Sequence, residues 1–370
     1  MKIVLTADTV GGVWDYAVTL AGELYGCGHE VLLAVLGEPR DERLAALPEG
    51  VEVTWRSYRL EWMPEAAGDV AEAGEWLART AALWGADVVH LNQMAYPIAD
   101  FAAPTLVVVH SDVLSWFRET LGAQAPAEWA EYARWVREGL GAADRVAAPT
   151  RFQAEQTRRH YGRVVDAVVP NGVRPPTAPP LPRAEPLVLS VGRAWDAAKG
   201  VRVLDEALRR LGAQAPSAHL LGETVAPHGE SFTPRYLISH GRVERAEVDA
   251  WMERAGIYVA ASLYEPFGLA PLEAALRGCA LVLSDIPSFR ELWNGCAHFF
   301  AAGDADALAE ALHVLHRDAE RRAALACAAR TRAQRRYTAG AMADSYLALY
   351  REMIEHAHPK QSARLHAGSP

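Results

Sequence analysis

Tyr264-Glu265-Pro266-Phe267-Gly268-Leu269-Ala270-Pro271-Leu272-Glu273-Ala274-Ala275 places two carboxylates on either side of a Phe-Gly-Leu turn. An apolar run at residues 257–261 precedes this stretch and predicts a buried strand, and a helical pattern follows it. In an open α/β sheet, ligands bind at the carboxyl ends of strands, beside helix N-termini. We therefore expect Glu265 at the exit of the strand and Glu273 in the first turn of the helix, both facing one crevice.

Carboxylates at such a crevice suit a polyhydroxylated ligand, because one carboxylate accepts hydrogen bonds from two hydroxyl groups. A simpler interpretation stays open. Glu273 can be an acid that the helix dipole favours, and Glu265 an ordinary loop residue. The other motifs of the chain bear on this choice.

The composition describes a globular chain of 370 residues, long enough for two domains. A net charge of -9 argues against nucleic acid as the main partner. The cysteines show no CxxC spacing and the histidines form no metal-binding motif, so we expect no metal site. There is no signal-peptide pattern and no apolar run of membrane-spanning length. We expect a cytoplasmic protein, and peripheral contact with the inner face of a membrane stays open.

Short apolar runs alternate with helical patterns, which predicts α/β domains with parallel sheets that helices cover on both faces. A proline-dense segment, residues 174–182, fits neither a sheet nor a helix and is the best candidate for a linker. The predicted parts are a first Rossmann-like domain (1–168), a linker (169–186), a second Rossmann-like domain (187–337), a helix (338–357) and a disordered tail (358–370). Two similar halves joined by a stiff linker imply a cleft, where ligand sites are common.

The same patterns predict the individual elements. Strands are expected over residues 3–6, 31–35, 51–56, 87–91, 105–110, 187–191, 219–221, 238–241, 257–261 and 280–284. Helices are expected over residues 13–26, 72–84, 127–140, 151–160, 201–211, 245–255, 270–277, 305–337 and 341–356.

A glycine pair, Gly11-Gly12, follows the first predicted strand and opens a helix. Glycines at this position let a ligand approach the backbone, and the helix N-terminus offers unpaired N–H groups to an anion. The segment is not GxGxxG, so a nicotinamide dinucleotide is not indicated. Standing alone, such a pair more often marks a tight strand-to-helix turn.

Two cations lie six residues apart after the first strand of the second half, in Val191-Gly192-Arg193-Ala194-Trp195-Asp196-Ala197-Ala198-Lys199-Gly200. Arg193 offers a planar fork and Lys199 a mobile point charge, and both can converge on one multiply charged anion. A diphosphate fits this pair, which would then replace a divalent metal. The alternative is a solvated surface loop with ordinary charges.

A histidine, His110, ends the valine-rich strand predicted over residues 105–110. At the carboxyl end of a strand it would face a cleft, where it could donate to a sugar hydroxyl or lie beside a reacting carbon. The alternative is a histidine that bonds to the backbone.

In their order and spacing these segments resemble those of family 4 glycosyltransferases with the two-Rossmann (GT-B) architecture. The matching segments span nearly the whole chain: Gly11-Gly12, His110, Pro170-Asn171-Gly172-Val173, Val191-Gly192-Arg193, Lys199-Gly200 and residues 265–273. The resemblance implies two Rossmann-like domains that face each other across a cleft, with the last helix crossing back to the first domain.

The resemblance also implies the reaction. The enzyme would be a retaining, metal-independent glycosyltransferase that uses a nucleotide-diphosphate sugar of UDP or GDP type and needs no other cofactor. The acceptor would be a hydroxyl group of a glycan, a lipid-linked molecule or a small molecule. The mechanism would be front-face: the acceptor attacks beside the departing phosphate, which takes its proton, and no protein nucleophile is assigned.

The resemblance assigns roles to named positions. Arg193 and Lys199 would hold the diphosphate, and Glu273 the ribose hydroxyls. Residues expected to be catalytic are His110, Arg193, Lys199 and Glu265. Further donor-binding positions are Gly11, Gly12, Val243 beside the base, and the backbone N–H groups of Phe267, Gly268 and Leu269, which with Glu265 would hold sugar hydroxyls and phosphate.

The first half departs from the family pattern at Trp14 and Asp15, which are bulky and acidic near the expected phosphate. Trp14 and Trp116 are candidates for the acceptor side, because aromatic faces suit sugar rings or an apolar aglycone. The alternative is that both tryptophans are core residues. Two other functions also stay open: a nucleotide-sugar epimerase on the same scaffold, and a non-catalytic two-lobed sugar-binding protein.

Overall fold

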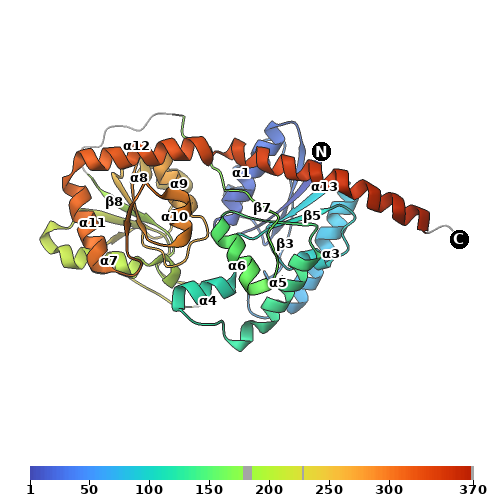
Figure 1. Ribbon diagram of the computed structural model, residues 1–370, viewed down its shortest axis with the longest axis horizontal. Helices are drawn as coiled ribbons and strands as arrows, with labels where there is room; N and C mark the ends of the chain where they lie inside the picture. The colour runs from blue at the N-terminus through green and yellow to red at the C-terminus, as the bar shows by residue number, and fades with distance from the viewer. Residues whose placement is uncertain (178–185, 227–228, 368–370) are drawn as a thin grey trace. The chain divides into compact units, whose positions relative to one another are not determined.

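The computed structural model describes residues 1–177, 186–226 and 229–367, with the side chains of α13 described as far as Ala357. The chain forms two compact units (Figure 1). The first contains Met1–Ser115, Gln124–Arg174 and the described residues from Ala339 onward. The second contains Trp116–Ala123 and the described residues of Pro175–Thr338. Residues 178–185 of the predicted linker lie outside the described residues.

The first unit is built on a parallel sheet with the strand order β3-β2-β1-β4-β5-β6-β7. Its strands are β1 (Lys2–Asp8), β2 (Glu30–Leu36), β3 (Glu52–Arg56), β4 (Val88–Leu91), β5 (Thr105–Val108), β6 (Arg145–Ala148) and β7 (Ala167–Val168). Its helices are α1 (Val13–Gly26), α2 (Asp41–Ala45), α3 (Ala67–Trp84), α4 (Val113–Leu121, shared with the second unit), α5 (Ala130–Ala142), α6 (Arg151–Tyr161) and α13 (Ala339–Ala367).

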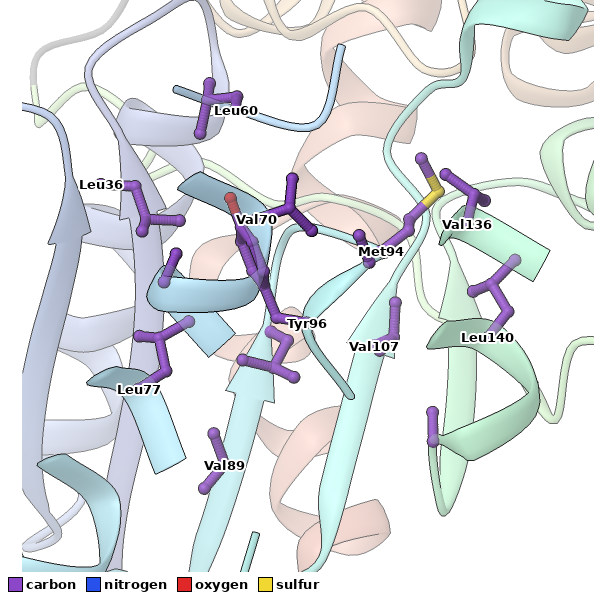
Figure 2. Close-up of a cluster of buried hydrophobic side chains, with 14 of the residues drawn as sticks. Leu36, Leu60, Val70, Leu77, Val89, Met94, Tyr96, Val107, Val136 and Leu140 are labelled. Atoms are coloured by element: carbon purple, nitrogen blue, oxygen red, sulfur yellow. The ribbon is translucent and has the colours of Figure 1, made fainter. Parts of the chain in front are cut away.

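Helices cover both faces of this first sheet, because alternate side chains of a strand point to opposite faces. Ile3 and Leu5 of β1 belong to the apolar cluster that includes side chains of α1 and α13. Val4 belongs to the cluster on the other face, with side chains of α3 and α5. Figure 2 shows this second cluster, where Tyr96 stands among aliphatic side chains with its hydroxyl end toward the segment that carries Leu60.

The last helix, α13, packs against α1 within the first unit (Figure 1). Its first residue donates a backbone hydrogen bond to Val173 (N···O 3.1 Å), and Met342, Tyr346 and Tyr350 are buried beside α1. The helix continues to Ala367, into the segment for which the sequence predicts a disordered tail. Alanine, glutamine and arginine in this segment are good helix formers, whereas Pro359 within it is not.

The second unit repeats the same arrangement, with a parallel sheet in the order β10-β9-β8-β11-β12-β13. Its strands are β8 (Val188–Val191), β9 (Ala218–Leu221), β10 (Ile238–Ser239), β11 (Ile257–Ala260), β12 (Ala280–Ser284) and β13 (His298–Phe300). Its helices are α7 (Val201–Leu211), α8 (Arg245–Arg254), α9 (Leu269–Leu276), α10 (Pro287–Trp293), α11 (Ala305–Arg317) and α12 (Ala319–Arg336). The prediction of two Rossmann-like parallel sheets is confirmed.

One long helix was expected over residues 305–337, and this prediction is wrong. The helix is interrupted at Asp318, between α11 and α12. The Asp318 side chain accepts a hydrogen bond from the backbone N–H of Arg321 (2.8 Å) and so caps the second helix.

The strand order reverses at the same place in both sheets: between β1 and β4 in the first, and between β8 and β11 in the second. Ligands of open α/β sheets bind outside the carboxyl ends of the strands at this reversal. Among the described residues, no helix is both long and apolar enough to cross a membrane.

Candidate functional site

The reversal point of the second sheet brings Lys199 and Glu265 together. Lys199 follows β8 and Glu265 follows β11, and the Lys199 Nζ and Glu265 Oε2 atoms lie 2.6 Å apart. The two loops are joined through their backbones, since Leu263 N–H donates to the carbonyl of Ala198 (2.8 Å). Both side chains are only partly exposed. The pair places a cation and a carboxylate at the edge where a ligand is expected.

Gly200 lets these two loops approach closely. Its φ is +62°, and a Cβ atom there would lie 1.9 Å from the carbonyl oxygen of Ala261. Only glycine adopts this conformation and leaves that space free. The position next to Lys199 is therefore fixed by the packing of backbone on backbone.

Asp196 orders the rest of the loop after β8, and the motif analysis missed it. Its carboxylate accepts from the backbone N–H of Ala198 (3.0 Å) and pairs with Arg193 (2.8 Å). Arg193 also lies over the ring of Trp195, with its guanidinium carbon 5.0 Å from the centroid. An Asp three residues before Lys-Gly is the sequence signal that could have revealed this cap.

Trp116, expected on the acceptor side, belongs to the second unit. Its indole N–H donates to Asp196 (3.3 Å), and its ring packs edge-on against Phe117. In the structure α4 begins in the first unit, and the division between the units falls between Ser115 and Trp116.

Two contacts stabilise the Phe-Gly-Leu turn after Glu265. Ser288 Oγ donates to the Glu265 carbonyl (2.5 Å), and the buried Phe267 ring packs edge-on against Tyr337. Gly268 has a φ of +87° and precedes α9, whose first residue is Leu269. The turn thus places the N-terminus of α9 after Glu265, as the sequence predicts.

Glu273 lies in the second turn of α9, not in the first, because the helix already begins at Leu269. Its carboxylate is nearly buried and pairs with Arg245 of α8 (2.6 Å). Arg245 also pairs with Asp249 (2.9 Å), which in turn pairs with Arg277 (2.7 Å). Arg245 is a second residue that the sequence analysis missed, since no motif connects it to Glu273.

Val243 follows the edge strand β10 and is half-buried. The loop that carries it is tied to the loop after β9, because Gly222 N–H donates to the carbonyl of Gly241 (2.7 Å). A Cβ atom on Gly222 would lie 1.9 Å from the Gly192 carbonyl oxygen. The loops after β8, β9 and β10 are thereby in backbone contact along one edge.

The glycine loop of the first unit is exposed, with Gly11 at a φ of +71° and Gly12 as the residue before α1. The Trp14 side chain, in contrast, is buried in the core, and Arg43 lies over its ring (5.1 Å). The interpretation of Trp14 as a core residue is therefore the correct one. Asp15, the next residue, stands exposed in the first turn of α1.

His110 lies two residues beyond β5, and its Nε2 atom is 2.8 Å from Oδ1 of Asn92. The Tyr16 ring packs edge-on against it, with the ring centroids 4.4 Å apart. Burial lowers the pKa of His110 to about 3, so the ring is neutral near neutral pH. His110 therefore bonds to a side chain, not to the backbone as in the simpler interpretation.

A buried polar network continues from Asn92 along the same edge. Asn92 N–H donates to Thr6 Oγ1 (2.8 Å), Thr6 donates to Gln93 (2.7 Å), and Gln93 donates to Asp8 (3.0 Å). Nearby, Glu61 accepts from the backbone N–H of Met94 (3.1 Å). Burial raises the pKa of Asp8 to about 6 and that of Glu61 to about 7.

Two family models match the chain. The model described as Glycosyltransferase Family 4 matches residues 10–175, and the one described as Glycosyl transferases group 1 matches residues 185–318. The phosphatidyl-myo-inositol mannosyltransferase of Mycobacterium leprae is 27% identical, over 93% of this chain and 93% of its own length. A glycogen synthase of Mycobacterium tuberculosis is 29% identical, over 73% of this chain and 71% of its own length.

Solved structures show the same fold. The sucrose-phosphate synthase of Thermosynechococcus elongatus superposes with a TM-score of 0.76 at 20% identity, over 96% of this chain and 100% of its own. Anabaena HepE in complex with UDP-glucose superposes with a TM-score of 0.73 at 18% identity, over 96% and 100%. Family models, relatives and fold agree with the motifs along both units, and the chain belongs to the family 4 glycosyltransferases of GT-B architecture.

Proposed function

We propose that this glycosyltransferase transfers a sugar from a nucleotide-diphosphate sugar to a hydroxyl acceptor, with retention at the anomeric carbon and without a metal ion. The observation that carries the proposal is the contact between Lys199 and Glu265 at the reversal point of the second sheet. A cation and a carboxylate 2.6 Å apart match the two parts of a donor, a diphosphate and a sugar with free hydroxyls.

The proposed roles follow from charge. Cleavage of the glycosyl–phosphate bond builds negative charge on the departing diphosphate, and fixed cations stabilise that charge more in the transition state than in the ground state. Lys199 and Arg193 would supply these cations, so no metal is required. Glu265 would accept hydrogen bonds from sugar hydroxyls, and Glu273 would hold the ribose once Arg245 shares its carboxylate.

The first unit would bind the acceptor and orient reacting groups. The neutral His110 ring would contact a substrate hydroxyl, and the exposed Gly11-Gly12 loop would let phosphate approach the backbone. The proton of the acceptor would leave with the departing phosphate.

Relatives guide the choice of substrates for testing. Their names point to phosphatidyl-myo-inositol, mannose and glycogen, and the HepE complex contains UDP-glucose. We expect a UDP- or GDP-type donor and a glycan, lipid-linked or small-molecule acceptor. A lipid-linked acceptor would require peripheral contact with a membrane from the cytoplasmic side, which co-sedimentation with vesicles can test.

The decisive experiment is a panel of UDP-, GDP-, ADP- and TDP-sugars, assayed for hydrolysis and transfer with EDTA present. We expect turnover of at least one donor in EDTA, and NMR of the first product should show the anomeric configuration of the donor. Loss of activity in EDTA or an inverted anomer would refute those parts of the proposal. Unchanged turnover in Glu273→Ala and Arg193→Ala would refute the site, and acceptor-free conversion of the sugar would favour an epimerase.

A further inference from the structure

A chain of hydrogen bonds connects α13 to the ring of His110. The Tyr350 hydroxyl lies 2.6 Å from Nδ1 of His90. Nε2 of His90 lies 3.2 Å from Oδ1 of Asn92, and Nε2 of His110 lies 2.8 Å from the same oxygen. His90 is fully buried and Asn92 nearly so, whereas His110 is half-buried. Two imidazole rings thus share one amide oxygen.

The orientation of the Asn92 amide follows from its third partner. Its Nδ2 lies 2.5 Å from the backbone carbonyl oxygen of Thr6, which can only accept. The amide NH₂ must therefore face Thr6, and the amide oxygen must face the histidines. Because that oxygen can also only accept, His90 and His110 each carry a proton on Nε2.

The same network defines the other nitrogen of each ring. Burial lowers the pKa of both His90 and His110 to about 3, so each ring holds a single proton near neutral pH. Nδ1 of His90 is unprotonated and accepts from Tyr350. Nδ1 of His110 is unprotonated as well, and the described residues give it no hydrogen-bond partner. In this tautomer the ring can accept a hydrogen bond at Nδ1 but cannot donate one there.

We propose that Asn92, His90 and Tyr350 are positioning residues that hold His110 as its Nε2–H tautomer, so that Nδ1 accepts a hydrogen bond from a substrate hydroxyl. The inference rests on the substrate-binding role proposed for His110 above. It gives α13 a function besides packing, because its Tyr350 hydroxyl protects the Nδ1 lone pair of His90 from protonation.

The neighbours of the His90 and His110 rings support the proposal that neutral side chains determine which nitrogen of each ring is protonated. Tyr16 from α1 packs edge-on against His110 and lies 3.3 Å from Nε2 of His90 through its hydroxyl. Tyr346 from α13 packs edge-on against His90, with centroids 4.8 Å apart. No carboxylate of the described residues is bonded to either ring, so the tautomers depend on neutral partners.

The first test reads the tautomer directly in the substrate-free enzyme. With ring-¹⁵N histidine and a His110→Gln difference spectrum for assignment, long-range ¹H–¹⁵N NMR should show a protonated Nε2 and an unprotonated Nδ1 for His110 and His90. Tyr350→Phe should give His90 a mixture of tautomers and broaden the His110 signals. Tyr346→Phe is the matched control on the same helix and should leave both patterns unchanged. A protonated Nδ1 on His110 in the unaltered enzyme would overturn the inference.

The second test is kinetic. Tyr350→Phe should lower kcat about 2- to 10-fold with little change in KM, as expected for loss of one neutral hydrogen bond. Asn92→Asp should keep the acceptor for Nε2, although it removes the NH₂ group that donates to the Thr6 carbonyl. Its negative charge should stabilise the doubly protonated His110 ring, which puts a donor at Nδ1. Its kcat should therefore fall about 10-fold or more at pH 6 and recover toward pH 9, a profile absent from the unaltered enzyme.

The two tests separate the inference from the proposed function. If NMR shows the Nε2–H tautomer but His110→Ala transfers sugar at an undiminished rate, the role proposed for His110 fails, and the substrate part of the inference fails with it. If His110→Ala is inactive while Tyr350→Phe and Tyr346→Phe match in both spectra and kcat, only the positioning role is refuted. Circular dichroism of each variant confirms that it is folded before it is compared.

Discussion

At the scale of single residues, Lys199 carries the sharpest prediction. Its ammonium group contacts Glu265 and lies on the loop that Asp196 orders. Lys199→Gln keeps a hydrogen-bond donor, on a somewhat shorter side chain, but removes the charge. Because a hydrogen bond to a charged group contributes about 1.5–3 kcal/mol, kcat/KM should fall roughly 10- to 100-fold. Initial rates with the donor identified in the panel give this ratio.

The control for Lys199→Gln is Arg209→Gln. Arg209 pairs with Glu206 on α7 of the same unit at 2.6 Å, the same distance as in the Lys199 pair, but the Arg209 side chain is exposed and that of Glu206 only half-buried. An exposed pair contributes at most about 1 kcal/mol to folding, and this one touches no predicted site. Its kcat/KM should stay within about 2-fold of the unaltered enzyme. Equal losses in both variants would show that charge on the unit as a whole, and not Lys199, matters.

Glu61 predicts a pH dependence of stability. Burial raises its pKa from 4.5 to about 7, so the folded chain retains a proton that the unfolded chain has released between those values. The free energy of unfolding must then fall as pH rises through this interval, by about 1.36 kcal/mol per pH unit. The full loss of stability is reached above pH 7. Glu61→Gln should remove the cost and gain on the order of 3 kcal/mol between pH 4.5 and 8. Urea unfolding at several pH values measures it.

A matched variant makes the Glu61 prediction specific. Glu75 is exposed on α3 of the same unit, so Glu75→Gln should change stability by the same small amount at every pH. In Glu61→Gln the remaining carbonyl oxygen still accepts from the Met94 N–H. Parallel pH profiles for Glu61→Gln and the unaltered enzyme would contradict the argument.

Residue types at strand ends could be predicted from the sequence, whereas their partners could not. Lys199 and Glu265 were expected at one edge, and the structure puts them in contact. Arg245, which pairs with Glu273, lies 28 residues away on another helix, and no periodicity connects them. Trp14 looked like a candidate for ligand contact, but helix rotation about its axis decides which side is buried, and Arg43 covers the ring.

At the scale of elements, the approach of the β8 and β11 loops depends on Gly200. Gly200→Ala would add strain at a φ of +62° and drive a methyl group into the Ala261 carbonyl, which would lie 1.9 Å away. The loop must shift, and Lys199 shifts with it. We expect a stability loss of about 2 kcal/mol or more and a fall in kcat/KM of roughly 100-fold. Thermal unfolding and initial rates measure both.

Gly162→Ala is the control that separates the effect of backbone strain from that of a steric clash. It also has a left-handed conformation, with a φ of +73°, but a Cβ atom there meets nothing within 4 Å. Gly162→Ala should therefore cost only the backbone strain, about 1 kcal/mol, and leave kcat/KM unchanged. If Gly200→Ala behaved like Gly162→Ala, the close packing of the two loops would not be what positions Lys199.

Most elements could be predicted because strand and helix periods differ so clearly in this chain. The helix at residues 201–211 and the strand at 280–284 have the predicted bounds. The break at Asp318 escaped prediction, because a single capping carboxylate interrupts an alanine- and arginine-rich pattern that continues on both sides. The helix α9 begins one residue early, which moves Glu273 into the second turn.

At the scale of the whole molecule, the chain uses one sheet order twice and closes the first unit with its last helix. In both sheets the order of the strands reverses at the equivalent place, so both units present loops at an equivalent edge. The first unit is discontinuous in sequence, since α13 returns to it after the entire second unit. Its integrity therefore depends on residues that follow the entire second unit along the chain.

Removal of α13 tests this dependence. Its buried side chains against α1 are Met342, Ala343, Tyr346, Leu347, Tyr350 and Met353. Each large side chain contributes about 1.5–3 kcal/mol by burial, and together they approach the whole stability of a typical domain, about 5–15 kcal/mol. A chain ending at Thr338 should lose the cooperative unfolding of the first unit, expose apolar surface and bind a hydrophobic dye.

A chain ending at Ala357 keeps every one of those contacts, so its melting temperature and kcat should match those of the full chain. If the shorter chain melted like the longer one, the contacts between α13 and α1 would contribute nothing to the fold, and Tyr350 could not position His110 from them.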